Sequence, residues 1–215
     1  NSFEGGYKGL LFQKRLLVDL YGYFGIYNDF ISRTLVAQSI NGDKSVFADP
    51  ATVRANLSDP KLATTYSVPV NVKGDVNTYG FGLSLTYSLL NNFLIDANVS
   101  SDHLGDVPQG FIAGFNAPEL RAGGSFSNTG FGKQNRFGFN VSYRWQDKID
   151  YQGDFANGVV PAYQVVDAQL SYKFFHPRFL LKIGATNLLN QYYRNGFGNP
   201  AIGGLYYVSL GYNVF

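Results

Sequence analysis

The sequence contains two histidines, His103 and His176, and no cysteine, which limits the nucleophilic chemistry open to it. Hydrolysis through a serine needs a base within hydrogen-bond reach of the hydroxyl and a third group that orients this base. Ser100 and Ser101 precede Asp102 and His103, but neighbours at one strand end do not build a triad. His176 lies in a short turn before a proline. We therefore expect that the chain is not an enzyme.

Signals for metals and cofactors are equally weak. Asp147, Asp150 and Asp154 could offer oxygen ligands to calcium, but their spacing lacks the EF-hand pattern and suits a solvated acidic loop. The glycines of Gly196–Gly198 and Gly203–Gly204 fall between two strand-like segments, whereas a dinucleotide fingerprint joins a strand to a helix. We expect no metal and no cofactor.

Aromatic and polar side chains of the predicted loops are the candidates for solute binding, because aromatic rings stack and polar groups orient a ligand. The candidates are Phe155, Tyr163, Tyr193, Arg194, Asn195 and Phe197. The alternative is that these aromatic residues pack the loops together or form an aromatic girdle at the upper membrane interface.

These loops must be positioned by strands, and two segments show the strand pattern clearly. Residues 137–146 and 79–88 each alternate between apolar and small or polar side chains. Successive side chains of a strand point to opposite faces, so each segment has one apolar and one polar face. Each is also about as long as a transmembrane strand, which needs roughly 9–11 residues.

The composition favours a membrane β-barrel. Charged residues make up 15%, aromatic residues 17%, and there are 25 glycines, yet no run approaches the roughly 20 apolar residues of a membrane helix. The net charge of +2 is too small to indicate nucleic acid binding. No signal peptide is visible in the residues given, although an outer-membrane protein must be exported. A soluble β-sandwich or lectin-like domain, which also alternates, is the alternative.

The chain reads as an all-β, antiparallel, up-and-down meander with nine strand-like segments. They lie at about residues 2–12, 16–36, 64–89, 93–101, 119–128, 134–149, 162–175, 179–188 and 204–214. Short connections alternate with long polar ones at 32–63, 101–118, 150–161 and 189–203. Outer-membrane barrels have short periplasmic turns and long extracellular loops.

Nine is an odd number, whereas bacterial single-chain barrels have even strand counts. We therefore expect residues 1–215 to be the carboxyl-terminal part of one larger barrel domain. A self-contained ten-strand barrel is the alternative, if the connection 32–63 hides a hairpin. In either case the charges within strands fall on the inward face, where they need water or partners: Asp96, Arg121, Arg144, Asp167 and Lys173.

Several segments resemble the carboxyl-terminal barrel region of TonB-dependent outer-membrane receptors, particularly those of Bacteroidetes. The similar segments are Phe3–Gly9, Tyr27–Ile31, Val166–Tyr172, Gly184–Tyr193 and Tyr206–Tyr212. The resemblance implies a plugged 22-stranded barrel, the architecture of outer-membrane transporters, of which these would be the last nine strands. It also implies uptake of a large or scarce solute, such as an iron chelate, cobalamin, a glycan or a peptide.

The resemblance also implies a location and partners. The chain would lie among the lipids of the bacterial outer membrane, and the plug and the TonB-contacting segment would belong to an amino-terminal part outside this sequence. Some relatives pair with a surface lipoprotein lid. The alternatives in function are a small independent outer-membrane barrel with a pore or structural role, and a soluble β-rich binding domain.

The end of the chain resembles the signal that the barrel-assembly machinery recognises, a terminal aromatic residue in phase with the apolar face. Phe215 is the terminal aromatic, but Tyr206, Val208, Leu210 and Tyr212 share the opposite face of a regular strand. A bulge near residue 213 would restore the phase, leaving Tyr212 and Phe215 as the candidate signal. The alternative is that Phe215 is an aromatic residue at the membrane interface.

Overall fold

The computed structural model describes residues 1–105, 107–108, 111–153 and 157–212. The chain divides into two compact units. The first comprises residues 1–25, 78–103 and 116–215, and the second comprises residues 26–77 and 104–115. No helix of the described residues is long and apolar enough to cross a membrane.

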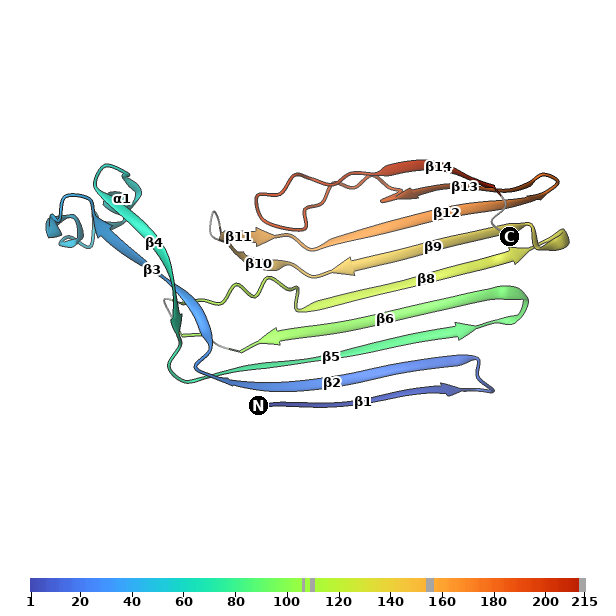
Figure 1. The fold of residues 1–215 in the computed structure, drawn as a ribbon, viewed down its shortest axis with the longest axis horizontal. Helices are drawn as coiled ribbons and strands as arrows, with labels where there is room; N and C mark the ends of the chain where they lie inside the picture. Colours follow the sequence, from blue (N-terminus) through green and yellow to red (C-terminus); the bar gives the residue numbers. More distant parts are fainter. Residues whose placement is uncertain (106, 109–110, 154–156, 213–215) are drawn as a thin grey trace. The chain divides into compact units, whose positions relative to one another are not determined.

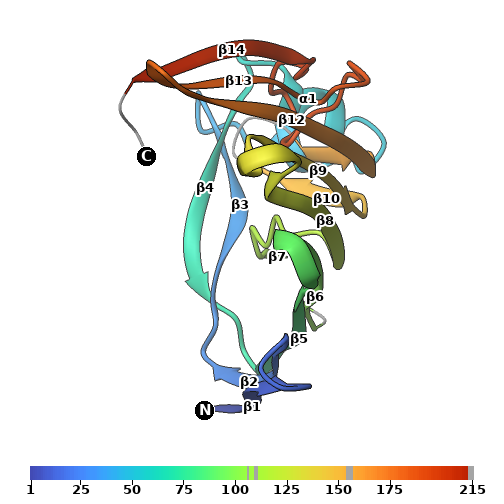
Figure 2. The same cartoon turned by 90° about the vertical axis from the view of Figure 1, so that its right-hand side faces the viewer.

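The first unit is built on a nine-stranded sheet in which neighbours in space follow each other along the chain (Figure 1). Seen end on, its strands follow a curve (Figure 2). The strands, in order, are β1 (Ser2–Leu11), β2 (Leu16–Asn28), β5 (Asp75–Ser88), β6 (Phe93–Leu104), β8 (Leu120–Phe131), β9 (Phe137–Gln146), β12 (Tyr163–Phe175), β13 (Arg178–Thr186) and β14 (Leu205–Tyr212). The predicted all-β meander of nine strands is confirmed.

Connections of two lengths alternate along this sheet, as predicted. Residues 12–15, 89–92, 132–136 and 176–177 form the short turns, which include the 3-10 helices η2 (Leu90–Asn92) and η3 (Lys133–Asn135). The turn 89–92 reverses the chain through Asn91 and Asn92, whose φ values of 58° and 64° suit asparagine. All four turns lie at one end of the sheet, on the right in Figure 1.

The second unit shows where the predicted segments 16–36 and 64–89 were wrong. Each is two strands: β2 ends before Asp29, whose φ is 54°, and β5 begins after Gly74, whose φ is 102°. A left-handed residue turns the chain, so alternation on both sides does not mean one strand. The strands beyond these breaks are β3 (Ile31–Ser39) and β4 (Ala63–Asn71), which form a small sheet with β7 (Phe111–Ile112).

The predicted connection 32–63 does not itself hide a hairpin, because β4 lies almost wholly beyond it. The strands β3 and β4 pair with each other in this separate sheet and do not add a tenth strand to the main one. Between them lie η1 (Lys44–Phe47) and α1 (Val53–Ser58). Asp43 begins η1 by accepting a hydrogen bond from the Ser45 backbone N–H at 2.9 Å. Hydrogen bonding from the side chain and the backbone of Ser45 lowers the pKa of the Asp43 carboxyl.

A second correction concerns the segment 134–149 and the connection 150–161. The strand β9 covers only Phe137–Gln146, and a separate hairpin of β10 (Ile149–Gln152) and β11 (Asn157–Val160) follows it. Ile149 and Val160 pair in this hairpin and are 5% and 1% exposed. Their burial explains why a polar connection forms a hairpin instead of an open loop.

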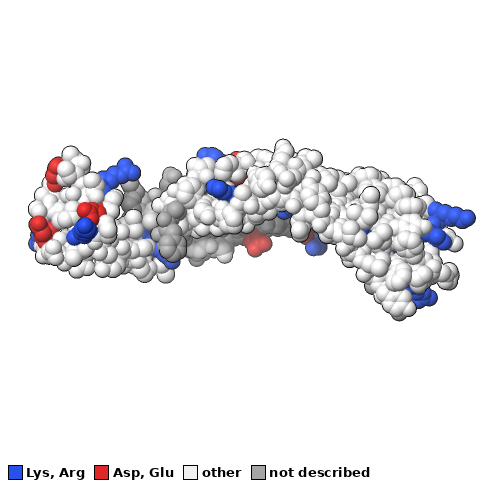
Figure 3. All heavy atoms as spheres, turned by 90° about the horizontal axis from the view of Figure 1, so that it is seen from above, with Lys and Arg blue, Asp and Glu red and all other residues white. Residues whose placement is uncertain are grey.

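The register of the main sheet gathers apolar side chains on one face. Leu170 of β12 lies opposite Phe139 of β9 and Ile183 of β13, and Ile183 lies opposite Val208 of β14. Leu170 and Val208 are 67% and 71% exposed. Viewed from above, the side of the sheet formed by β12–β14 carries few acidic or basic side chains (Figure 3). This outer face suits hydrocarbon rather than water.

Aromatic rings follow one another across this outer face near the short turns. Consecutive ring centroids lie 4.6 to 5.9 Å apart. We call this row the turn-side aromatic band, and it consists of Phe93, Phe126, Phe139, Phe131, Phe137, Tyr172 and Phe174. Barrel proteins carry such girdles where the membrane meets water.

The opposite, inner face brings tyrosine rings against glycines of the neighbouring strand. The ring of Tyr23 in β2 lies over Gly80 in β5, so a methyl group at Gly80 would come within 2.7 Å of the Tyr23 Cε1 atom. It would also meet the Ser101 backbone oxygen. Tyr207 lies over Gly184 in the same way and donates to Gln169 Oε1 at 3.0 Å. Glycine is therefore required here for close approach rather than for a turn.

A pair of neighbouring substitutions in the middle of β12 tests which face meets lipid. We expect Leu170→Arg to destabilise the folded barrel by about 2–4 kcal/mol, because an arginine near the bilayer midplane loses its hydration. Gln169→Arg points inward and should cost much less. Equilibrium unfolding in lipid vesicles measures both, and equal losses would contradict the assignment of the faces.

A second pair of variants tests the close approach of strands at Gly80. We expect Gly80→Ala to destabilise the barrel by about 1–3 kcal/mol, because the added methyl meets backbone that cannot move freely. Gly22→Ala in β2 is the matched control, since a methyl there meets only the Gly80 backbone oxygen, at an ordinary 3.7 Å. The same unfolding assay compares them, and a Gly80 variant as stable as the control would disprove the packing argument.

Candidate functional site

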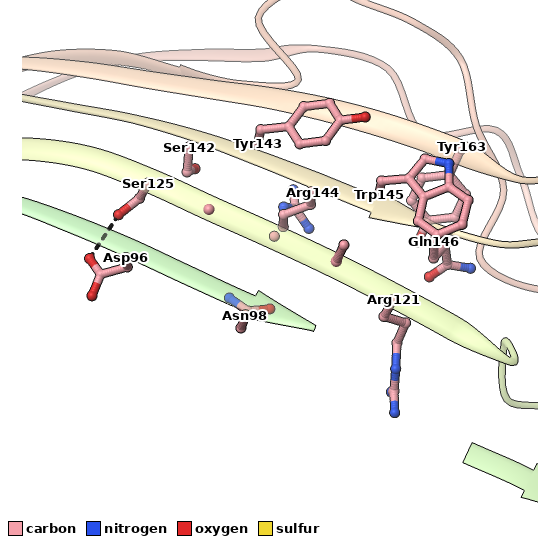
Figure 4. A pocket seen from close by; sticks show the side chains of 13 residues that line it. Asp96, Asn98, Arg121, Ser125, Ser142, Tyr143, Arg144, Trp145, Gln146 and Tyr163 are labelled. Atoms are coloured by element: carbon pink, nitrogen blue, oxygen red, sulfur yellow. Dashed lines mark hydrogen bonds between the residues drawn. The ribbon is translucent and has the colours of Figure 1, made fainter. Parts of the chain in front are cut away.

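The polar inner face of the main sheet is the candidate functional site. The register places Ser142 of β9 opposite Ser125 of β8 and Asp167 of β12, and it places Arg144 opposite Gly123. Because strand partners share a face, these side chains gather on the side opposite the aromatic band. Figure 4 shows part of this surface, with Asp96 and Ser125 joined across two strands.

Asp96 and Asp102 of this face are each held by groups from neighbouring strands. Asp96 accepts hydrogen bonds from Thr86 Oγ1 at 2.7 Å and from Ser125 Oγ at 2.9 Å. Asp102 accepts a hydrogen bond from the Tyr23 hydroxyl at 2.8 Å and pairs with Arg121. These contacts cross four strands, β2, β6, β5 and β8. The strands of the main sheet, which we call the wall, thus supply the partners that these inward charges were expected to need.

Asp167 connects the wall to the last long connection. One carboxylate oxygen lies 3.1 Å from Arg144 Nη2, and the other accepts the Asn187 backbone N–H at 2.8 Å. Asn187 is 2% exposed, and its side-chain oxygen in turn accepts the Gln191 N–H at 3.0 Å. The Arg144 and Asp167 side chains are 54% and 21% exposed, so the ion pair alone stabilises little and the buried N–H matters more.

The inner face is hollowed beside these residues. A depression of about 460 Å³, the size of a small-molecule site, is lined among others by Asp96, Asn98, Arg121, Arg144 and Tyr163. Its donors and acceptors suit a polar solute or a polar protein surface. Trp145 and Gln146 also line it, and neither was among the predicted binding residues. The sequence signal for both was only their place at the end of an alternating strand.

The structure brings together some of the predicted loop residues. Tyr163 and Tyr193 stack with ring centroids 4.3 Å apart. Both line a second depression with Trp145 and Gln164. Phe197 lies against Gly158 of β11, which fits the alternative that loop aromatic residues pack loops together.

The remaining predicted residues contribute less. Asn195 accepts a hydrogen bond from the Asn199 side chain at 3.0 Å, and Arg194 follows Tyr193 in the same connection. Phe155 lies outside the described residues. Solute binding by this set stays a prediction.

Of the two residues of the candidate assembly signal, the structure describes Tyr212. Tyr212 lies opposite Phe179 at the turn end of β14, with ring centroids 5.4 Å apart, and it shares the outer face with Leu210. Phe215 lies outside the described residues. Recognition by the assembly machinery stays a prediction.

Similarity to known proteins decides the family. The family model described as TonB-dependent receptor-like β-barrel matches residues 1–188. The chain belongs to this family. Its members are outer-membrane receptors and transporters of Gram-negative bacteria, not a class of enzymes. A search of curated proteins finds no match.

Solved structures of the TonB-dependent receptor fold are similar over nearly all of the chain. They include the copper transporter OprC, with a TM-score of 0.65, 15% identity and coverage of 97% of this chain and 30% of that one. For the siderophore receptor PirA from Acinetobacter baumannii the TM-score is 0.61 and the identity 15%, with coverage of 98% of this chain and 31% of that one. For the ferripyoverdine receptor of the outer membrane of Pseudomonas aeruginosa the TM-score is 0.59 and the identity 15%, with coverage of 97% of this chain and 26% of that one. The chain thus spans about a quarter to a third of these structures.

The two histidines lie at opposite ends of the main sheet. His103 lies in β6, not in a loop as predicted, where its ring lies 4.7 Å from the Tyr79 ring and 3.6 Å from Glu119. His176 is in a short turn at the other end of the sheet. Among the described residues, no group of three or more His, Cys, Asp or Glu side chains could hold a metal ion.

Replacing Asp167 tests whether the wall holds the last connection. We expect Asp167→Ala to destabilise the barrel by about 1–3 kcal/mol, because the buried Asn187 N–H loses its acceptor and Arg144 its partner. Asp150→Ala is the control, since its pair with Lys148 is 3.7 Å long and exposed. Denaturant unfolding measures both. A negligible effect at Asp167 would show that the connection does not depend on it.

Proposed function

We propose that this chain forms the last nine strands of the 22-stranded wall of a TonB-dependent outer-membrane transporter that takes up a large or scarce solute. The candidate solutes are an iron chelate, cobalamin, a glycan or a peptide. The observation that carries the proposal is the nine-stranded meander with an apolar outer face and a polar inner face, in a chain of this family. A 22-stranded barrel encloses a lumen wide enough for a plug.

The two edges of the sheet support a larger barrel. Strand directions alternate across nine strands, so β1 and β14 run the same way, toward the end with the short turns (Figure 1). These edges cannot pair with each other in an antiparallel barrel. Further strands would satisfy their free backbone groups, which agrees with the share of the solved relatives that the chain covers. The same observation argues against a small independent barrel.

Within such a transporter the wall has two tasks. Its outer face seals the bilayer, and its inner face presents paired charges and hydroxyl groups to the plug and to the solute path. The stacked Tyr163 and Tyr193 at the long-connection end are the residues we assign to solute contact. The plug and TonB would act through an amino-terminal part of the protein, and the barrel-assembly machinery would insert the wall. A surface lipoprotein lid over the long connections is compatible with this arrangement.

Uptake by the full-length protein tests the proposal. We expect accumulation of one solute class when a panel of ferric chelates, cobalamin, glycans and peptides is supplied to cells. Accumulation should stop in a strain that lacks TonB. Uptake that continues without TonB would instead indicate a passive pore.

Two variants refine the test. Tyr163→Ala and Tyr193→Ala should each raise the half-saturating solute concentration by about 2- to 10-fold, because a lost aromatic contact costs roughly 0.5–1.5 kcal/mol. Tyr87→Ala, near the short turns on the outer face, is the control and should leave uptake unchanged. An unaltered half-saturation in both variants would remove these tyrosines from the solute site.

A further inference from the structure

The short turns of the main sheet carry basic residues and no acidic ones. The connections 12–15, 89–92, 132–136 and 176–177 contain Lys14, Arg15, Lys133 and Arg136, and β13 begins at Arg178. Figure 3 shows basic side chains, without acidic ones, at the end of the molecule where these turns lie. Asp19 lies three residues inside β2 and Asp96 three residues inside β6, so neither belongs to a turn.

Four of these cations differ from those of the inner face in their partners. Lys8, Arg121 and Arg144 each pair with a carboxylate of the wall. By contrast, Lys14, Arg15, Lys133 and Arg178 are exposed and form no ion pair with any carboxylate in the described part of the chain. We call these four the turn-side cations. Their charge is available to a partner outside the chain.

Arg136 has a different task within the turn 132–136. Its guanidinium bonds to the Gln134 side chain at 2.9 Å and lies over the Phe175 ring, 5.2 Å from the centroid. It also donates to the Tyr172 hydroxyl at 3.5 Å, and Tyr172 belongs to the turn-side aromatic band. Arg136 thus ties the turn to the band and is not counted among the turn-side cations.

The aromatic band fixes the depth of the turn-side cations. Lys133 follows Phe131 by two residues, and Arg178 precedes Phe179, whose ring contacts Tyr212 on the same outer face. A strand rises roughly 3.3 Å per residue, so these cations lie just beyond the rings. Rings of this kind sit at the headgroup level of a membrane. Lys133 and Arg178 therefore lie where lipid phosphates are found, and Lys14 and Arg15 lie in a turn at the same end of the sheet (Figure 1).

We propose that the turn-side cations bind the phosphates of anionic phospholipids, of the phosphatidylglycerol kind, in the periplasmic leaflet of the membrane. The proposal rests on the proposed barrel and its orientation, with short turns on the periplasmic side. Charge complementarity is the driving interaction, because unpaired lysines and arginines next to an anionic surface attract its lipids. Lipid bound there would hold the turn end of the wall at a defined depth.

Native mass spectrometry of the full-length receptor in mild detergent tests this inference. The receptor is given equimolar phosphatidylglycerol and phosphatidylcholine of the same chain length, and the bound lipids are counted. We expect phosphatidylglycerol to be enriched by about fivefold for each cation that a lipid contacts. The enrichment should fall as salt rises from about 0.01 M to about 1 M, where the Debye length shrinks from roughly 30 Å to roughly 3 Å.

Two quadruple variants identify the residues responsible. The test variant carries Lys14→Gln, Arg15→Gln, Lys133→Gln and Arg178→Gln. The control removes the same number of exposed cations from the long connections, by Lys44→Gln, Arg54→Gln, Lys61→Gln and Lys148→Gln. The test variant should bind both lipids alike, and the control should retain the enrichment of the unmodified receptor.

Three results would overturn the inference: equal binding of both lipids by the unmodified receptor, enrichment that salt does not change, or a test variant that retains enrichment. The salt series uses unmodified protein, so it decides the question even if the test variant does not fold. Neither measurement needs solute or TonB. A receptor that binds phosphatidylglycerol but transports nothing would therefore contradict the proposed function and leave this inference standing.

Discussion

In the hydrocarbon layer of a membrane, every backbone N–H and C=O group must find its partner within the protein, and the structure depends on this constraint. The meander meets it by pairing each strand with the next along the chain. Once the backbone is committed to these ladders, side chains can only alternate between two faces. In the proposed transporter, the edges at β1 and β14 would meet the same constraint by pairing with further strands.

The two faces solve different physical problems with neighbouring residues. The outer face exposes Leu170 and Val208 and gathers aromatic rings near the turns. The inner face, which in the proposed transporter would meet water or a plug, uses Asp96 and Asp167 to join hydroxyl, guanidinium and backbone donors of separate strands. Most charges of the inner face are paired within the wall. A polar partner could therefore cover this face without burying an unpaired charge, which would be costly.

Local alternation predicted the main sheet well, because the strand period is a property of adjacent residues. Residues 137–146, which alternate without interruption, form β9, although the predicted segment 134–149 was longer at both ends. The breaks at Asp29 and Gly74 were missed, since a single left-handed residue leaves the alternation on either side intact. The site was predicted less completely: the contacts of Asp102 with Tyr23 and Arg121 join residues 79 and 19 positions apart, which no local pattern encodes. The stacking of Tyr163 on Tyr193 depends likewise on how the connection 187–204 folds back over the start of β12.

The most direct test of the two-faced wall is a spin-label scan along β9 in the full-length protein, reconstituted in lipid. This chain has no cysteine of its own to interfere with labels placed at positions 137–146. Labels at Phe139, Val141 and Tyr143 should be accessible to oxygen dissolved in the bilayer. Labels at Asn140, Ser142 and Arg144 should instead be accessible to a water-soluble nickel complex, if a plug leaves them in contact with water, or to neither reagent if it covers them. Accessibility without a two-residue period, or with oxygen reaching the second set, would contradict the account.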